Sequence, residues 1–392
     1  AATRVNQAGL IEKGRENLLT FSNDFSQWTK SGVTAASGES GYDGSSDAWL
    51  ITKNGGVFDQ ILRNVSSSAV NTISFYAKAG TLTSLYFRGQ SSSNIPDVKF
   101  NLSDGSLITS NNVISASSDN VGSGWYRLKM TFNNTITNIT IYPDFGQTTA
   151  GSIYIQDAQL EVGIAATSHI ETTATTAKAG VLEDAPRLDY SGGATEPSLL
   201  LEPQRSNLIT YSEYLNGSIW SHNSSTATIN ADVSPSGHND ATSLYISLAN
   251  AAVFSRAYFT NVANSTHIGS VFLKKVEGAE VRLRISGTAA SLDGSAIFNL
   301  DNGTYRDAVG SVTPSIESVG NGWYRCSIGD LSGSGIAAPS FRIDTLGAQN
   351  DTTVLVWGAA VEVGTYPTSY IPTYGSAVTR LGEACRRTGI SD

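Results

Sequence analysis

The sequence predicts an all-β fold made of two tandem antiparallel β-sandwich domains of the jelly-roll type. Apolar side chains alternate with polar ones, as where Val281, Leu283 and Ile285 interleave with charged residues, which is the period of a half-buried strand. Gly and Asn clusters interrupt such runs at spacings of about 8 to 15 residues, typical of a sandwich or barrel. Several phrases also occur twice, and no segment shows a capped apolar helical period.

Length and composition support this class and exclude others. A chain of 392 residues exceeds what one core usually holds, so two domains are expected. Charged residues make up 15%, against roughly 25% in typical domains, and the formal net charge is −9 with scattered Lys and Arg. Such a chain repels phosphate backbones, so nucleic acid is not expected as a partner.

Targeting segments are also missing from the sequence. No apolar run approaches the ~20 residues that a membrane span needs, and there is no signal peptide. The sequence starts without an initiator Met, so we expect a fragment or a processed product.

The repeated phrases indicate a duplication. They are ENLLTFS at 16–22 with SNLITYS at 206–212, FNLSDG at 100–105 with FNLDNG at 298–303, GSGWYRLKM at 122–130 with GNGWYRCSI at 320–328, and IYIQDAQLEVGIAATSHIET at 153–172 with VLVWGAAVEVGTYPTSYIPT at 354–373. The intervening stretch is rich in Thr, Ala, Pro and Gly, which is linker composition. The predicted division is an N-terminal connector at 1–15, a first sandwich at 16–173, a linker at 174–205, a second sandwich at 206–374 and a C-terminal connector at 375–392.

These phrases resemble the repeated domains of bacteriophage fibre and virion-surface proteins, especially those of marine phages. The layout of an Asn-Leu strand followed by Trp28, and again by Trp220, is similar to that of jelly-roll carbohydrate-binding modules. The resemblance covers nearly the whole chain. It implies a virion-surface or otherwise extracellular appendage that binds polysaccharide or host-surface glycan, often as a homotrimer.

The repeated Gly-x-Gly-Trp-Tyr-Arg phrase has two interpretations. Trp125 and Trp323 could stack on sugar rings, because a flat aromatic face complements a pyranose. Alternatively the phrase is a strand entered from a tight turn, with Tyr126 and Tyr324 in the core. Its preservation in both copies favours the scaffold role.

Binding is expected where the two copies differ. Aligning the strands after Gly80 and Gly278 places Leu85 and Phe87 opposite Leu283 and Ile285 on the core face. The other face carries Ser84, Tyr86 and Arg88 in the first domain, against Arg282 and Arg284 in the second. An aromatic platform and a guanidinium pair suited to carboxylated or sulfated sugars are the functional interpretation. An ordinary solvated face is the alternative.

The resemblance also implies a structural calcium ion, since such modules often hold Ca²⁺ near their first and last strands. The candidate ligands are Asp24, Asp157 and Glu161 in the first domain and Glu362 in the second. Gly358 replaces Asp157 in the second copy, so the two sites would differ. Alternatively, both glutamates cap a strand end by accepting backbone N–H bonds.

No catalytic motif is present, and the four histidines lie far apart in the sequence. A non-catalytic glycan-binding protein is therefore favoured. A glycan depolymerase, either a glycoside hydrolase or a polysaccharide lyase using loop carboxylates, and a purely structural virion decoration protein are the alternatives. Cys326 takes the place of Leu128 and is expected to be buried and apolar, with a Cys326–Cys385 disulfide left open.

Overall fold

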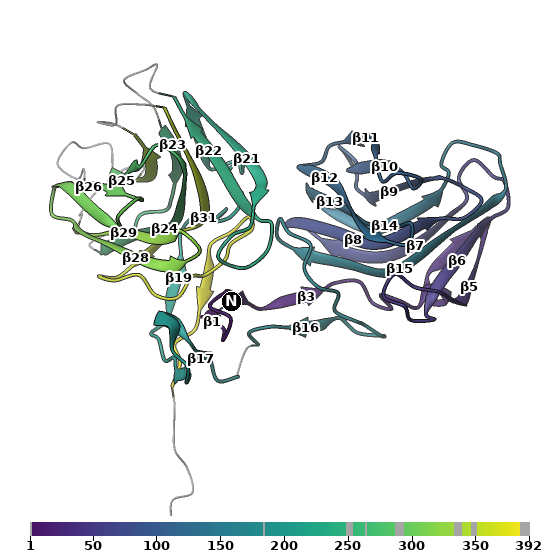
Figure 1. Ribbon diagram of the computed structural model, residues 1–392, viewed down its shortest axis with the longest axis horizontal. Helices are drawn as coiled ribbons and strands as arrows, with labels where there is room; N and C mark the ends of the chain where they lie inside the picture. Colours follow the sequence, from purple (N-terminus) through teal and green to yellow (C-terminus); the bar gives the residue numbers. More distant parts are fainter. Residues whose placement is uncertain are drawn as a thin grey trace, which may run out of the picture. The chain divides into compact units, whose positions relative to one another are not determined.

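The computed structural model describes residues 2–182, 185–247, 254–262, 265–286, 294–332, 339–345 and 351–384. The chain divides into two compact units, Arg15–Ala179 and a discontinuous unit of Ala1–Gly14 with Gly180–Asp392. Each unit contains one sandwich of two six-stranded antiparallel sheets (Figure 1). Residues 1–14 of the predicted N-terminal connector thus group with the second sandwich, as does most of the predicted linker, whereas Arg15 groups with the first.

The first sandwich consists of two sheets, in which several neighbouring strands come from distant parts of the sequence. One sheet runs β11 (Leu107–Asn111), β10 (Asp97–Asn101), β9 (Ser84–Gln90), β14 (Ile136–Pro143), β7 (Gln60–Ser67) and β4 (Thr29–Ser31). The other runs β12 (Ser115–Gly122), β13 (Trp125–Asn133), β8 (Val70–Ala79), β15 (Gly151–Val162), β6 (Ala48–Lys53) and β5 (Val33–Glu39).

The second sandwich repeats both orders strand for strand. One sheet runs β27 (Thr304–Val309), β26 (Gly294–Asn299), β25 (Glu280–Ser286), β30 (Ser340–Asp344), β23 (Phe254–Tyr258) and β20 (Trp220–Asn223). The other runs β28 (Thr313–Gly320), β29 (Trp323–Ser332), β24 (Thr266–Glu277), β31 (Thr352–Val363), β22 (Ala241–Ile246) and β21 (Ser225–Asp232). The predicted all-β class with tandem antiparallel sandwiches is confirmed.

Four short ladders flank the sandwiches. They are β1 (Thr3–Val5) with β2 (Ile11–Lys13), β3 (Arg15–Asn17) with β16 (Ala177–Ala179), β17 (Leu188–Asp189) with β18 (Ser198–Leu199), and β19 (Arg205–Asn207) with β32 (Val378–Arg380). The helical segments within the described ranges are two 3-10 turns, η1 (Phe25–Gln27) and η2 (Ser191–Gly193). No helix in that part of the chain has the length and hydropathy of a membrane span.

Period-2 alternation determines which side chains enter each core. Leu85 and Phe87 are fully buried in the first sandwich, and Leu283 and Ile285 are equally buried in the second. Their neighbours along each strand are partly exposed on the opposite side of the sheet. The predicted core face is therefore confirmed, and the opposite face is the outer surface of the β9 or β25 sheet.

The Gly-x-Gly-Trp-Tyr-Arg phrase forms a hairpin turn and the strand that follows it. Ser123 and Gly124 have φ of 52° and 76°, and Asn321 and Gly322 have φ of 52° and 78°. Positive φ at both turn residues matches the right-handed twist of the paired strands, which is the geometry of a type I′ hairpin. The repeated glycines serve this turn.

The Arg of the same phrase ties a distant loop to the sheet. Arg127 donates to the carbonyl of Thr167, and Arg325 donates to the carbonyl of Thr368 at 2.6 Å. Glu161 accepts the backbone N–H of Thr167, as Glu362 accepts that of Thr368. The phrase and the glutamates are thus parts of one loop anchor that both sandwiches share.

The N-terminal ladder completes the second unit. Ile11 packs on the outer face of the β24–β31 sheet with Phe272, Trp357 and Tyr370, and its N–H donates to Pro235 O at 2.9 Å. Burying such apolar area stabilises the unit at about 25 cal/mol per Å². In the first unit, Tyr42 from the β5–β6 loop stacks on Tyr76, the counterpart of Phe272, at 3.5 Å. In the second sandwich, Ile11 from the N-terminal ladder therefore covers the outer face of the sheet, whereas in the first sandwich Tyr42 from a loop of the same sandwich covers it.

Cys326 is fully buried on β29 with a free thiol, as expected for an apolar core position. Burial raises the pKa of that thiol well above its usual range. Cys385 lies outside the described residues, so the disulfide stays untested.

Candidate functional site

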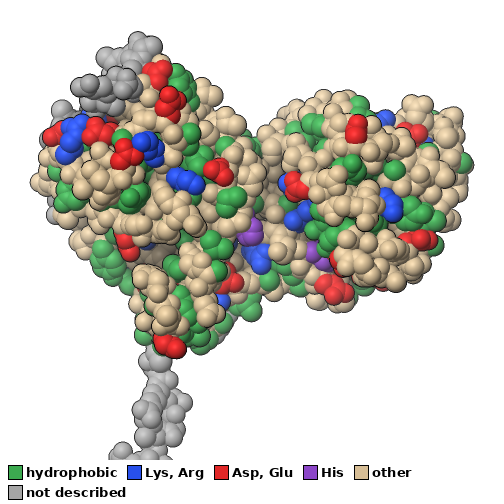
Figure 2. Space-filling view, viewed as in Figure 1, with side chains coloured by type: hydrophobic (Ala, Val, Ile, Leu, Met, Phe, Trp, Pro, Cys, Tyr) green, Lys and Arg blue, Asp and Glu red, His purple; other side chains and the backbone are tan. Residues whose placement is uncertain are grey.

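The two sandwiches present matching outer faces with different chemistry. Tyr86 on β9 lies directly opposite Tyr142 on β14 in the first sandwich. Arg284 on β25 lies directly opposite Arg342 on β30, at the same place in the second sandwich. Two aromatic side chains in one copy thus correspond to two guanidinium groups in the other. On the face shown in Figure 2 most of the surface is uncharged.

The first face carries an aromatic cluster that we call the aromatic surface: Phe58, Tyr86, Tyr142 and Phe145. Phe145 stacks on Tyr86 with ring centroids 4.5 Å apart, and lies edge-on to Tyr142 at 5.0 Å. Phe58 packs against Phe145 at 5.8 Å and is 66% exposed. Phe58 is therefore the part most open to a ligand, Phe145 and Tyr86 are partly exposed, and Tyr142 is buried.

Polar contacts hold this arrangement in place. The Asp144 N–H donates to Ser84 O at 3.0 Å, and the Ser84 hydroxyl donates to Asp144 Oδ1 at 2.9 Å. The buried Lys53 ammonium donates to Asp144 O at 2.8 Å and to Gln147 O at 2.6 Å. These bonds fold the turn after β14 back over β9. Ser84, predicted as a binding residue, thus positions the turn that carries Phe145.

The remaining predicted residue on this face also joins the cluster. The Arg88 guanidinium lies over the Tyr142 ring at 5.3 Å, a cation–π distance. Burial raises the pKa of Tyr86 to about 12 and raises that of Tyr142 as well. Both phenols therefore remain protonated at neutral pH, and Tyr86 is the one that is partly exposed, because Tyr142 is 2% exposed.

The second face divides the two predicted arginines. Arg282 makes a two-point ion pair with Asp344, Nε–Oδ1 2.7 Å and Nη2–Oδ2 2.9 Å, and the Asp344 side chain is 1% exposed. That guanidinium is committed to the fold, which corrects its predicted role as a ligand group. Arg284 instead lies in line with Arg342 and Arg256 on the neighbouring strands.

Trp125 and Trp323 are 1% and 2% exposed. Neither indole offers a face to a sugar, because Trp125 packs with Ala48 and Tyr76 and Trp323 packs in the cluster around Trp357. Their candidacy as stacking platforms is wrong, and the scaffold interpretation of the phrase holds.

The predicted calcium ligands have other partners. Glu161 and Glu362 each bond the backbone N–H and the hydroxyl of one threonine, and Asp24 accepts the Ser26 N–H at the start of η1. Among the described residues, no group of three or more His, Cys, Asp or Glu side chains is placed to hold a metal ion. Calcium stays a prediction without a ligand cluster to support it.

Asp157 and its counterpart Gly358 occupy a β-bulge. Their φ values are 55° and 64°, and the pairing register of β15 and β31 shifts there. A bulge residue in this region favours Gly or a short polar side chain. Backbone conformation thus accounts for the Asp-to-Gly difference without a metal.

A chain of Ser22, His169 and Asp157 in the first sandwich has the order of a nucleophilic triad. Ser22 Oγ lies 3.1 Å from His169 Nε2, and Asp157 Oδ1 lies 3.4 Å from His169 Nδ1. Burial lowers the pKa of His169 to about 4 and raises that of Asp157 to about 6. Ser22 is fully buried and its hydroxyl already accepts the Thr172 N–H, so a substrate could not reach it. This set of Ser22, His169 and Asp157 is therefore a structural hydrogen-bond network.

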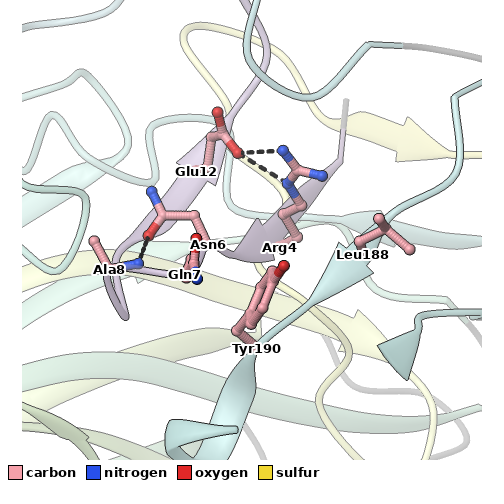
Figure 3. A pocket seen from close by; sticks show the side chains of 7 residues that line it. All are labelled: Arg4, Asn6, Gln7, Ala8, Glu12, Leu188 and Tyr190. Atoms are coloured by element: carbon pink, nitrogen blue, oxygen red, sulfur yellow. Dashed lines mark hydrogen bonds and ion pairs between the residues drawn. The ribbon is translucent and has the colours of Figure 1, made fainter. Parts of the chain in front are cut away.

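A hollow of about 670 Å³ adjoins the N-terminal ladder in the second unit (Figure 3). Its lining residues are Arg4, Asn6, Gln7, Ala8, Glu12, Leu188 and Tyr190. Arg4 and Glu12 form an ion pair at 2.8 Å, and Asn6 Oδ1 accepts the N–H groups of Ala8 and Leu10. Since these polar groups bond one another, the hollow is a weaker candidate than the two faces.

Comparison with known proteins adds little to this picture. No protein-family model and no curated protein matches the chain. The tandem CBM22-1–CBM22-2 domains of Paenibacillus barcinonensis Xyn10C are similar at 12% identity, over 90% of this chain and 99% of that one, with a TM-score of 0.27. The vicilin of Solanum melongena is similar at 7% identity, over 93% and 85% of the two chains, with a TM-score of 0.12. At these scores neither likeness carries an argument about the ligand.

Proposed function

We propose that the chain is a non-catalytic polysaccharide-binding protein whose ligands contact the outer faces of the β9 and β25 sheets. The aromatic surface is the observation that carries the proposal. Phe58 is 66% exposed beside the partly buried Phe145, and a flat aromatic face complements the C–H face of a sugar ring. Arg88 and the protonated Tyr86, both partly exposed, supply nearby donors for sugar hydroxyls.

The proposal includes the setting that the sequence motifs imply. We place the protein on the surface of a phage particle or a similar extracellular appendage, with host-surface or environmental glycan as partner and a homotrimer as the assembled form. Two weak sites on one chain would gain avidity through effective concentration, and a trimer would gain more. The low charge and the high Ser, Thr and Asn content are compatible with such a surface.

Replacing Phe58 by Ala is expected to weaken binding of a neutral polysaccharide roughly tenfold, because one exposed aromatic contact is worth about 1.4 kcal/mol. Stability should change little, since the ring is 66% exposed. Affinity electrophoresis against a panel of neutral glycans measures the effect. Tyr305→Ala, which removes a ring that is 49% exposed outside the aromatic surface, is the matched control.

Equal affinity of the Phe58→Ala variant and the parent protein would overturn the assignment of this face. The same glycan panel separates binding from cleavage. Release of reducing ends or unsaturated sugars would replace the proposal by a depolymerase, and silence of the intact oligomer on every glycan would favour a structural decoration protein.

A further inference from the structure

Three arginines form a row across the outer face of the second sandwich. Arg256 on β23 pairs in register with Arg342 on β30, which pairs in register with Arg284 on β25. All three point away from the core, because their strand neighbours Ala257, Phe341 and Ile285 are buried in it. With strands ~4.8 Å apart, the row spans roughly 10 Å. All three side chains are partly exposed.

Two acidic residues on the same sheet pair with arginines outside this row. Asp344 on β30 takes Arg282, and Glu280 on β25 takes Arg306 at 2.6 Å. Ser221 and Ser295 occupy the ends of the same row on the flanking strands. The row thus places three guanidinium groups side by side, within a chain whose formal net charge is −9.

Such a row costs stability. Like charges directly opposite each other on neighbouring strands destabilise a sheet. Each of the three arginines also makes a contact within the protein, so ligand contacts would add to an existing network. The Arg256 guanidinium lies over the Tyr258 ring at 4.5 Å, which directs it along the face. A repeated anionic ligand would offset the repulsion.

The guanidinium group also indicates the ligand's chemistry. Its planar fork matches the paired oxygens of carboxylate and sulfate groups. A single small anion reaches two neighbouring forks at most, whereas three forks in line suit anions repeated along a polymer. The net negative charge of the chain opposes any polyanion, so the choice of polysaccharide over nucleic acid rests on the proposed glycan-binding function.

We propose that Arg256, Arg342 and Arg284 form a binding site for sulfated or carboxylated polysaccharide. This inference deepens the proposed function and rests on it, since it names the ligand class of the second face. The two sandwiches then contact different parts of the ligand. The aromatic surface contacts neutral sugar rings, and the arginine row contacts acidic groups of the same or a neighbouring polysaccharide molecule.

The test compares dextran sulfate with unsulfated dextran of equal length on the full chain. We expect dextran sulfate to bind more tightly, with an affinity that falls as salt screens the charges. Arg284→Ala with Arg342→Ala should weaken that binding at least about tenfold. Arg306→Ala, which removes an exposed cation beyond the row, should leave it unchanged.

Arg342→Lys guards against a folding artefact, since it keeps the charge but loses the fork. We expect this variant to have the same melting temperature as the parent protein and to bind dextran sulfate several-fold more weakly. Unchanged binding in the double alanine variant would overturn the site. Equal binding of single-stranded DNA of matched length would overturn the choice of polysaccharide. Loss of neutral glycan binding in Phe58→Ala with dextran sulfate binding retained would leave this site standing, so the two proposals fail separately.

Discussion

Replacing Lys13 by Met is expected to lower the free energy of unfolding of the second unit by about 3–5 kcal/mol. The Lys13 ammonium lies 2.9 Å from both carboxylate oxygens of Glu213, 2.8 Å from the Tyr374 hydroxyl and 3.6 Å from Asp240. The side chains of Glu213 and Asp240 are 0% exposed. Without Lys13, both carboxyl groups lose their cation while water stays excluded.

The loss should depend on pH. Burial raises the pKa of Glu213, and the Lys13 charge holds that rise back. The variant therefore raises this pKa further. A carboxyl group whose folded pKa exceeds its unfolded value favours the folded state when protonated, so the destabilisation should shrink as the pH falls through the folded pKa. Calorimetric unfolding at neutral and acidic pH measures this.

Two variants control the Lys13 experiment. Lys13→Met with Glu213→Gln should recover part of the loss, because one buried charge is removed with its partner. Lys129→Met in the first unit breaks an exposed pair with Asp119 and should cost at most about 1 kcal/mol. Hydrogen exchange of β24 and β31 peptides locates the effect. An equal change for the Lys13 and Lys129 variants would contradict a role for the N-terminal segment in the second unit.

The duplication and the core faces were predictable because local patterns encode them. Alternation assigns Leu85 and Leu283 to the core from their own strands alone. The repeated phrase marked equivalent hairpins, whose turn residues need positive φ. Partners far apart in the sequence were not predictable, since no local signal links Lys13 to Glu213 across 200 residues.

On the two candidate faces, too, features encoded by local patterns were predictable and contacts between distant segments were not. The equivalent strands that carry Tyr86 and Arg284 could be identified as candidates because the two copies differ there. The strands beside them come from distant parts of the sequence and were not predictable. The Phe-Arg-Ile-Asp run at 341–344 has the alternation that could have identified Arg342 as outward-facing. Phe145 gave no such signal, because a turn folded back by Lys53 and Ser84 carries it onto Tyr86.

Arg282→Ala is expected to destabilise the second sandwich by about 3–5 kcal/mol, comparable to the loss of Lys13. It leaves Asp344, which is 1% exposed, without a two-point partner in the middle of a sheet. The sequence pattern alone would treat Arg282 and Arg284 as equivalent surface residues. The structure predicts instead that Arg282→Ala lowers the melting temperature of the second unit and so cannot serve as a clean binding variant.

Two comparisons isolate the Arg282 effect. Asp344→Asn in the Arg282→Ala background removes the buried carboxylate that has lost its two-point partner and should recover part of the stability. Arg306→Ala breaks the exposed pair with Glu280, which lies on β25 as Arg282 does. It should barely shift the melting temperature, because water replaces the lost partner. Thermal unfolding followed by near-UV circular dichroism reports all three variants. Similar small shifts for Arg282→Ala and Arg306→Ala would mean that Asp344 is solvated, and would return Arg282 to the set of ligand-binding candidates on the β25 face.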